Sequence, residues 1–377
     1  MLFNEIIGQK ETKDRLLQLA KEERVGHAML FAGREGSGKL ALAIAFARYL
    51  NCKNRGQNDS CNECSSCRKY SKLVHPDLHL VFPVAETKSS GKNPVSDDFL
   101  AAWREFVLAS PYMRPFQWYE YAGIDKKQGS ISKNESLQII RKLSFKNFEA
   151  PYKVVLIWMA EKMNLPAANK LLKILEEPPP GTVFLLVAED AGQIIPTILS
   201  RTQLIRVPGI DPASMGKALE ERHGIKERER IDSLVRMAGG NYLQLLGSLG
   251  ENEETAFHFD RFVMLMRLCF SLDLPGISGW IDDMADKGRE KHKQFLQYAL
   301  RMIRGNFMRN IMGGDLDRLS EEERDFSARF SAFVHSGNVY AIYNEFNKAF
   351  AHIEYNGNGR LIFFDLAIKM ARLLKTR

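Results

Sequence analysis

The residues with the clearest chemistry are four cysteines in the first part of the chain. Their spacing is Cys-x8-Cys-x2-Cys-x2-Cys, and they are Cys52, Cys61, Cys64 and Cys67. Four thiolates suit a tetrahedral zinc ion, and two-residue gaps let neighbouring sulfurs converge on it. The spacing therefore predicts one structural Zn²⁺, with free surface thiols or a redox pair as the alternatives. We do not expect a catalytic zinc, because four cysteine ligands leave no position for water.

A glycine-rich loop shortly before the cysteines could cradle phosphate groups. It fits the pattern Gly-x-x-x-x-Gly-Lys, and its candidate nucleotide-binding residues are Gly33, Gly36, Gly38 and Lys39. Glycines let backbone N–H groups turn towards phosphate oxygens, while the lysine reaches the outer phosphates. A plain glycine turn is the alternative, but a strand-like run precedes this loop and a helical run follows it, as a phosphate loop requires. The hydroxyl that should come next to bind Mg²⁺ is replaced by Leu40.

The second half of a nucleotide site is altered as well. Residues 154–157 form an unbroken apolar run, typical of a strand buried on both faces of a parallel sheet. In a nucleotide-hydrolysing enzyme two acids follow such a strand, one for Mg²⁺ and one for the attacking water. This chain has Trp158 and Met159 instead. Productive hydrolysis of Mg-ATP is therefore not expected, while the sequence leaves open whether the loop still holds a nucleotide.

Composition limits the class of protein. The chain has 377 residues, an apolar content of 45% and a formal net charge of +7. Its size and apolar content predict a folded protein of two or three domains, and its charge permits nucleic-acid or acidic partners without establishing them. No apolar run approaches the length of a membrane span, and the N-terminal stretch has acids where a signal peptide needs an apolar core. We therefore expect a cytoplasmic protein with no membrane partner.

These candidate residues need a scaffold, and the pattern of elements predicts one. Through residues 1–207, strand-like runs alternate with helical ones, which favours an α/β domain with a parallel, doubly wound sheet and helices on both faces. The cysteine segment (about 52–67) and a polar, aromatic stretch (about 85–130) interrupt this alternation as insertions. Strand-like runs are absent from the sequence after 207. We therefore expect a small helical domain at 208–252 and an all-α domain at 253–377.

Two local patterns belong to this scaffold. Ser132 and Glu135 have the spacing of a capping box at the start of a helix. The second insertion contains an aromatic group that could stack on bases or, as we expect, pack the insertion onto its host sheet. The group consists of Phe116, Trp118, Tyr119 and Tyr121. The sequence assigns the insertion no function of its own.

The order of these motifs resembles that of one protein family. The phosphate loop, the four-cysteine insertion, His-Pro-Asp at 75–77, the stretch ANKLLKILEEPPPGTVFLL and the turn LSRT are similar to bacterial clamp-loader subunits of the AAA+ class. The resemblance is strong over residues 1 to about 250 and weaker beyond. It implies a RecA-like AAA+ domain with a zinc knuckle, then a small helical lid and a helical collar for oligomerisation.

The same resemblance implies a set of partners. In DNA polymerase III, three copies of an ATPase subunit (gamma or tau) form a five-membered ring with delta and delta-prime, and the ring places the sliding clamp on primed DNA. The degraded nucleotide site favours the non-catalytic delta-prime branch of the family. A catalytically active, gamma/tau-like ATPase is the alternative, and a stand-alone DNA-binding protein is a third interpretation.

The resemblance also assigns roles to residues outside the two sites. Ser200, Arg201 and Thr202 match the family's Ser-Arg-Cys motif, with threonine in the third place. In the family this arginine reaches a γ-phosphate bound by the neighbouring subunit, which makes Arg201 a candidate arginine finger in trans. The lid arginine that contacts nucleotide in cis is replaced here by Leu243. The resemblance therefore implies a chain whose own site is degraded but which serves the site of a neighbour.

Overall fold

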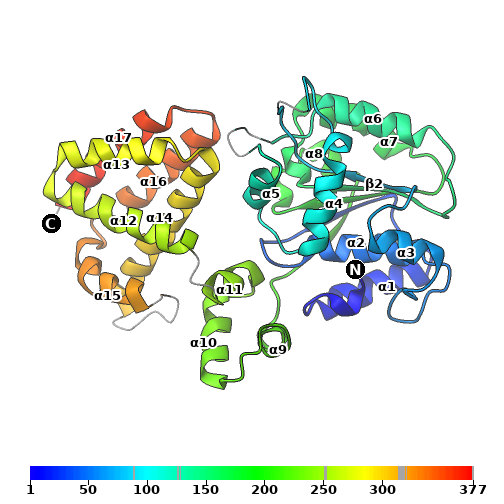
Figure 1. Cartoon of the computed structure of the whole chain (residues 1–377), viewed down its shortest axis with the longest axis horizontal. Helices are drawn as coiled ribbons and strands as arrows, with labels where there is room; N and C mark the ends of the chain where they lie inside the picture. Colours follow the sequence, from blue (N-terminus) through cyan, green and yellow to red (C-terminus); the bar gives the residue numbers. More distant parts are fainter. Residues whose placement is uncertain are drawn as a thin grey trace. The chain divides into compact units, whose positions relative to one another are not determined.

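The structure, a computed structural model, describes residues 1–375 apart from 88–89, 125–126, 128, 250–252, 313–318 and 320. The chain divides into two units, Met1–Leu245 and Leu246–Arg377 (Figure 1). A few residues of the expected second insertion, the end of the expected lid and parts of the expected collar therefore lie outside the described residues.

A five-stranded sheet forms the middle of the first unit. Its spatial order is β2-β3-β4-β1-β5, and every neighbouring pair is parallel. The strands are β1 (Ala28–Ala32), β2 (Leu78–Val81), β3 (Lys153–Trp158), β4 (Thr182–Ala188) and β5 (Gln203–Arg206). Strands β3 and β4 are buried along their whole length, as their apolar sequences predict. The predicted parallel α/β fold is confirmed.

Alternate side chains of the strands feed two cores, one on each face of the sheet. Leu156 and Leu185 belong to one core, and Ile157 and Leu186 belong to the other. Helices α1 (Lys10–Lys21) and α2 (Lys39–Leu50) complete the first core, and α6 (Lys133–Leu143) and α7 (Leu165–Glu176) complete the second. In Figure 1 the sheet is seen nearly edge-on, with α1 and α2 below it and α6 and α7 above.

Shorter elements complete the first unit. The helix α3 (Ser65–Ser71) follows the cysteines, and α8 (Pro196–Leu199) precedes β5. The second insertion holds α4 (Leu100–Ala109) and α5 (Pro115–Tyr121). After the sheet come α9 (Pro212–His223), α10 (Arg228–Ala238) and the start of α11 (Tyr242–Leu249), whose residues from Leu246 onwards belong to the second unit. The 3-10 helices are η1 (Phe3–Glu5), η2 (Ser96–Phe99), η3 (Ala160–Lys162) and η4 (Ala191–Gln193).

The capping box predicted at the start of α6 is not formed. Ser132 occupies the N-cap position without a side-chain bond to the helix. Glu135 is buried, and its carboxylate accepts a hydrogen bond of 2.6 Å from the backbone N–H of Ser96 in the insertion. The prediction was wrong because a residue distant in sequence provides the better partner for this buried acid.

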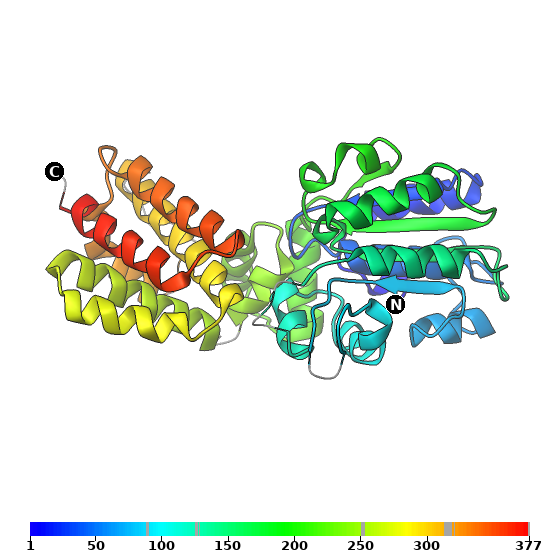
Figure 2. The ribbon, with the colours of Figure 1, turned by 90° about the horizontal axis from the view of Figure 1, so that it is seen from above.

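All the regular elements that the structure describes in the second unit are helices. Its elements are α12 (Glu253–Ser271), α13 (Leu274–Ala285), α14 (Arg289–Met312), α15 (Glu321–Phe330), η5 (Ser331–Phe333), α16 (Val339–Glu354) and α17 (Gly359–Leu373). Their apolar faces share one core, in which Trp280 contacts Phe295 and Phe363. Helices α16 and α17 lie side by side (Figure 2). In the described parts of the chain, no helix combines the length and the apolar composition that crossing a membrane requires.

Candidate functional site

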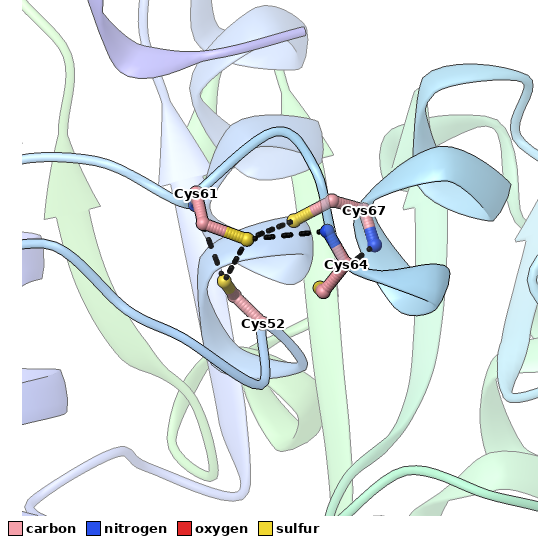
Figure 3. A group of neighbouring side chains, drawn as sticks. All are labelled: Cys52, Cys61, Cys64 and Cys67. Carbon is pink, nitrogen blue, oxygen red and sulfur yellow. Dashed lines mark hydrogen bonds between the residues drawn. The ribbon is translucent and has the colours of Figure 1, made fainter.

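The four cysteines converge on one point. Their sulfur atoms all lie within 4.8 Å of one another (Figure 3). The sulfur of Cys61 lies 3.5 Å from that of Cys52 and 3.9 Å from that of Cys67. Sulfurs about 2.3 Å from a tetrahedral zinc ion would be about 3.8 Å apart, so this arrangement fits a single ion. The four cysteines can therefore bind a metal ion such as zinc.

Backbone N–H groups prepare these sulfurs for a cation. The amides of Cys61, Cys64 and Cys67 each donate to the sulfur of the preceding cysteine, at 3.3–3.4 Å. Hydrogen bonds from the Cys64 and Glu63 backbones lower the pKa of Cys61 to about 6. Burial raises the pKa of Cys52 to about 12. Metal ions bind the thiolate form, so a bound ion requires the Cys52 thiol to lose its proton.

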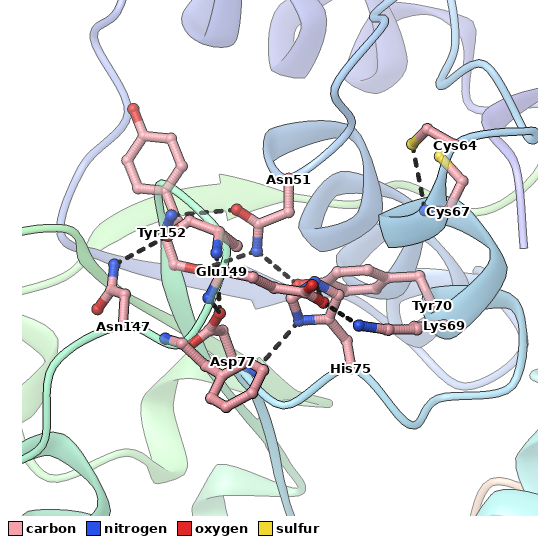
Figure 4. A network of polar contacts seen from close by, with 12 residues as sticks. Asn51, Cys64, Cys67, Lys69, Tyr70, His75, Asp77, Asn147, Glu149 and Tyr152 are labelled. Carbon is pink, nitrogen blue, oxygen red and sulfur yellow. Dashed lines mark hydrogen bonds and ion pairs between the residues drawn. The ribbon is translucent and has the colours of Figure 1, made fainter.

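A buried polar network ties the cysteine module to the sheet (Figure 4). The Asp77 carboxylate accepts hydrogen bonds from the backbone N–H groups of Phe148, Glu149 and Ala150, at 2.7–3.0 Å. Lys69 on α3 forms an ion pair of 2.5 Å with Glu149. These bonds connect the helix that follows the cysteines to the segment that leads into β3.

His75 belongs to this network and not to the cysteine cluster. The Asp77 backbone N–H donates to its Nδ1 at 3.1 Å, and its ring lies against that of Tyr70, with centroids 4.7 Å apart. The Asn51 side chain donates to the Tyr70 hydroxyl at 2.7 Å and accepts from the Tyr152 N–H at 3.1 Å. The His-Pro-Asp motif therefore serves the attachment of the module.

The glycines of the candidate phosphate loop are required by its backbone. The loop connects β1 to α2, and Gly36 and Gly38 have the left-handed φ values +70° and +83°. A Cβ atom on Gly33 would lie 2.2 Å from the carbonyl oxygen of Val207. A side chain is therefore excluded at one of these positions and strained at the other two.

Lys39 faces acids of its own chain. Its Nζ donates to the Arg34 carbonyl oxygen at 3.3 Å and lies 3.9 Å from Oε1 of Glu189. Burial lowers the pKa of Lys39 and raises the pKa of Glu189 and of Glu161, and the attraction between these opposite charges counters each shift. Glu161 Oε1 also accepts the Glu189 backbone N–H at 2.9 Å. Lys39 thus has negative charge beside it without any nucleotide.

Sequence reasoning missed Glu161 and Glu189. A signal was available, because Glu189 follows directly on β4 and Glu161 comes shortly after β3. The carboxyl ends of parallel strands meet at one edge of a sheet, where ligands bind in α/β proteins. Charged residues just after these two strands therefore deserved consideration together with Lys39.

Residues from the insertion and from the start of α11 cover the loop. The Tyr242 N–H donates to the Gly36 carbonyl oxygen at 3.3 Å, and a Cβ atom on Gly36 would lie 2.0 Å from Asn241 Oδ1. A Cβ atom on Gly38 would lie 3.2 Å from the ring of Tyr112. The rings of Tyr112 and Tyr242 contact each other, with centroids 4.9 Å apart. Protein atoms therefore lie directly against both glycines that have positive φ.

Apolar residues pack at the end of β3. Trp158 is buried, and its ring centroid lies 4.8 Å from that of Trp103 on α4. Trp103 in turn stacks on Phe82 and meets the edge of Trp118, at 4.2 and 4.9 Å. Met159 is also buried and has a left-handed φ of +56°. The insertion thus packs onto the sheet at the strand end where an ATPase carries its acids.

Arg201 lies between α8 and β5, with its side chain about one-third exposed. Its Nε donates to Oε1 of Glu176 at 2.6 Å, and its Nη2 pairs with the same oxygen. Its Nη1 donates to the Thr197 carbonyl oxygen at 2.7 Å and to Ser200 Oγ at 3.2 Å. The Thr202 hydroxyl donates to a backbone carbonyl of the same turn at 2.9 Å. Arg201 therefore takes its partners from α7 and α8 and not from the phosphate loop.

Comparisons with known proteins place these features in a family. The family model described as "DNA polymerase III, delta subunit" matches residues 8–211. A DNA polymerase III subunit delta' from Bacillus subtilis is 29% identical over 216 residues, which make up 56% of this chain and 51% of that protein. One from Pseudomonas aeruginosa is 28% identical over 245 residues, or 63% of this chain and 61% of that protein.

A differently named relative is similar as well. A DNA polymerase III subunit tau from Bacillus subtilis is 25% identical over 201 residues, which are 53% of this chain and 28% of that protein. The chain spans about half to three-fifths of the length of the two delta-prime relatives. Because the family model matches more than half of its residues, this chain belongs to the delta-prime family of DNA polymerase III clamp-loader subunits.

Proposed function

We propose that this chain is the non-catalytic delta-prime member of a DNA polymerase III clamp loader, which helps to place the sliding clamp on primer-template DNA. In this proposal it works in the cytoplasm, in a five-membered ring with gamma or tau ATPase subunits and a delta subunit. It hydrolyses no ATP itself and supplies Arg201 to the ATP site of a neighbour. The observation that carries the proposal is the contrast between a phosphate loop covered by protein and an arginine at the surface.

The chain's own site lacks what hydrolysis requires. Leu40 and Trp158 offer no oxygen to Mg²⁺, and Met159 cannot orient an attacking water. An incoming nucleotide would add phosphate charge next to Glu161, which is partly buried, and Glu189, whose side chain is 40% exposed and lies 3.9 Å from Lys39. Like charges brought close together repel, so we propose that the loop binds no nucleotide.

Two further contacts support a closed loop. Arg114 of the insertion pairs with Glu35 within the loop, and Tyr112 and Tyr242 pack above its glycines. Leu243, which stands where the family carries a nucleotide-contacting arginine, is buried. Binding a nucleotide would therefore require the insertion and the start of α11 to move, without a new ligand contact from Leu243 as compensation.

Arg201 has the chemistry to act on a neighbour's nucleotide. A guanidinium is charged at every physiological pH and presents a fork of N–H donors that matches phosphate oxygens. Placed against a γ-phosphate, it offsets the charge that develops as the phosphoryl group leaves, which is worth roughly 10³ to 10⁵ in rate in other NTPases. In this proposal Ser200 and Thr202 fix the turn that carries the arginine.

The zinc ion is proposed as a structural part of this scaffold. One Zn²⁺ per chain would be held by Cys52, Cys61, Cys64 and Cys67, whose four sulfurs leave no position for water. It would stabilise a module that the Asp77 network attaches to the segment before β3. The ion would thus support the sheet and take no part in chemistry.

The second unit offers surfaces for ring assembly. Tyr340 and Tyr343 on α16, and Leu361 and Phe364 on α17, are between 44 and 76% exposed. Residues three positions apart lie on one face of a helix, so each pair forms a small apolar surface. Clustered exposed apolar side chains mark protein interfaces, and we propose that these helices contact the collars of neighbouring subunits.

Measurements on the isolated full-length chain test the proposal that it neither binds nor hydrolyses ATP itself. We expect no ATP hydrolysis above background and no retention of ATP in equilibrium dialysis at millimolar nucleotide. The alternative, a gamma/tau-like ATPase, is favoured by the retained glycines and by Lys39. It predicts hydrolysis that disappears in Lys39→Ala. Hydrolysis with that dependence would overturn the non-catalytic assignment.

A further inference from the structure

We propose that Glu176 is a reversible latch on Arg201, which holds the guanidinium until a phosphate of a neighbouring subunit's ATP replaces the carboxylate. The inference rests on the proposed function, because it concerns the regulation of the same arginine. It assigns a role to a residue of the Leu-Glu-Glu-Pro stretch for which sequence reasoning gave none.

The N–H donors of the Arg201 guanidinium are already occupied by groups of the same chain. An arginine binds a phosphate or carboxylate through a fork of parallel N–H donors. In Arg201 one such fork, Nε and Nη2, is engaged by Oε1 of Glu176, and Nη1 is engaged by Thr197 and Ser200. The same donors cannot serve Glu176 and a phosphate together. Arg201 must therefore release the carboxylate before it can hold a γ-phosphate through this fork.

The ion pair between Arg201 and Glu176 can separate at little cost in free energy. The Arg201 and Glu176 side chains are 32% and 46% exposed, so water can solvate each when they separate. A partly exposed ion pair shifts an equilibrium by no more than about fivefold. A γ-phosphate carries more negative charge than a carboxylate and presents three oxygens. A correctly placed nucleotide can therefore displace Glu176, whereas in an isolated chain the guanidinium stays paired with the carboxylate.

The position of Glu176 at the end of a helix favours its ion pair with Arg201. Glu176 is the last residue of α7, where the helix dipole disfavours a negative charge. Pairing with Arg201 relieves that cost. Glu177, the next residue, is also exposed, but it makes no ion pair with any residue that the structure describes. Glu177 therefore provides a matched control for charge at the same end of the helix.

The first test measures the reactivity of Arg201 in the isolated full-length chain. Phenylglyoxal modifies accessible arginines, and mass spectrometry gives the rate at each site. We expect Glu176→Gln to raise the modification rate of Arg201 by about two- to fivefold, the range set by loss of a surface ion pair. Glu177→Gln should leave that rate unchanged. An unchanged rate in Glu176→Gln would show that no latch exists.

The second test uses the assembled clamp loader without DNA. If the latch holds Arg201 back, Glu176→Gln should speed ATP hydrolysis at the site that Arg201 serves by about two- to fivefold. In a ring with three independent sites this raises total basal turnover by about 1.3- to 2.3-fold with an unchanged KM, and the added Arg201→Ala change should cancel the gain. Basal turnover that is unchanged or lower in Glu176→Gln overturns the latch while leaving the finger intact. If Arg201→Ala alone has no effect, the proposed function fails instead, and the labelling experiment still decides whether the pair exists.

Discussion

Trp103 packs against Trp158 with ring centroids 4.8 Å apart, and this contact joins the insertion to the end of β3. Trp158 stands where a nucleotide-hydrolysing enzyme of this fold carries the acid that binds Mg²⁺. The aromatic residues of the insertion form the site that Trp158 fills. The same insertion contributes Tyr112, which covers the phosphate loop.

Removal of the Trp103 ring should destabilise the first unit. Trp103 is fully buried, and its replacement leaves a cavity that the stacked rings around it cannot fill. We expect Trp103→Ala to lower the free energy of unfolding by about 3–5 kcal/mol, measured by urea denaturation followed by circular dichroism. Leu108→Ala, on the exposed side of the same helix, should change it by no more than about 0.5 kcal/mol. Equal effects of the two substitutions would refute a buried role for the tryptophan.

The cysteine cluster predicts a definite metal content. The purified chain should contain about one zinc ion per molecule, and Cys64→Ser should lose the ion together with part of the stability of the first unit. Elemental analysis and thermal unfolding measure the two effects. Cys269→Ser is the control, because Cys269 lies in the core of the second unit and should leave the metal content unchanged. A folded chain that contains no metal would contradict the assignment.

The stability of the first unit should fall on mild acidification because of His79. Burial lowers the pKa of His79 to about 4, whereas an unfolded histidine titrates near 6.5. Between these values the unfolded chain binds a proton that the folded chain does not, so the free energy of unfolding falls as the pH falls. We expect a loss of about 2–3 kcal/mol over this window. His79→Gln should remove this loss and the exposed His352→Gln should retain it; equal pH slopes in both variants would contradict this cause.

Alanine substitutions at two glycines test the contact between the phosphate loop and the start of α11. Both Gly36 and Gly224 have positive φ, but only at Gly36 would an added Cβ meet another residue, at 2.0 Å from Asn241 Oδ1. Gly224→Ala should cost about 1–2 kcal/mol from backbone strain alone. Gly36→Ala should cost more in urea denaturation, and the double variant with Asn241→Ala should recover part of the excess. If Gly36→Ala and Gly224→Ala cost the same, Asn241 does not press on the loop.

Local patterns in the sequence were enough to predict the scaffold. The apolar runs of β3 and β4, the glycines between β1 and α2 and the spacing of the cysteines each depend on neighbouring residues. The parallel sheet, the helical C-terminal region and the cysteine cluster were predicted for that reason. Three of the four aromatic residues of the insertion pack inside as expected, since Phe116, Trp118 and Tyr119 are buried, whereas Tyr121 is exposed.

What the sequence did not predict depends on contacts between distant segments. Glu189 meets Lys39, Glu176 meets Arg201 and Asn241 meets Gly36 only because the chain folds back on itself. No spacing in the sequence encodes these pairs. The failed capping box has the same origin, because Glu135 bonds to Ser96 from the insertion. Local spacing thus located the candidate residues, and tertiary contacts determined their partners.

The proposal as a whole depends on Arg201, and the decisive experiment removes it from the assembled clamp loader. The measurement is the DNA-stimulated ATPase rate of a complex that carries Arg201→Ala in this chain alone. Loss of a finger slows its own site by roughly 10³ or more, so turnover of a ring with three ATPase subunits should fall by about a third if the sites are independent, and further if they are coupled. The complex should still assemble, and Arg206→Ala, at an exposed arginine of β5, should behave like the wild type. A complex with Arg201→Ala that assembles and hydrolyses ATP at the wild-type rate would contradict the proposal.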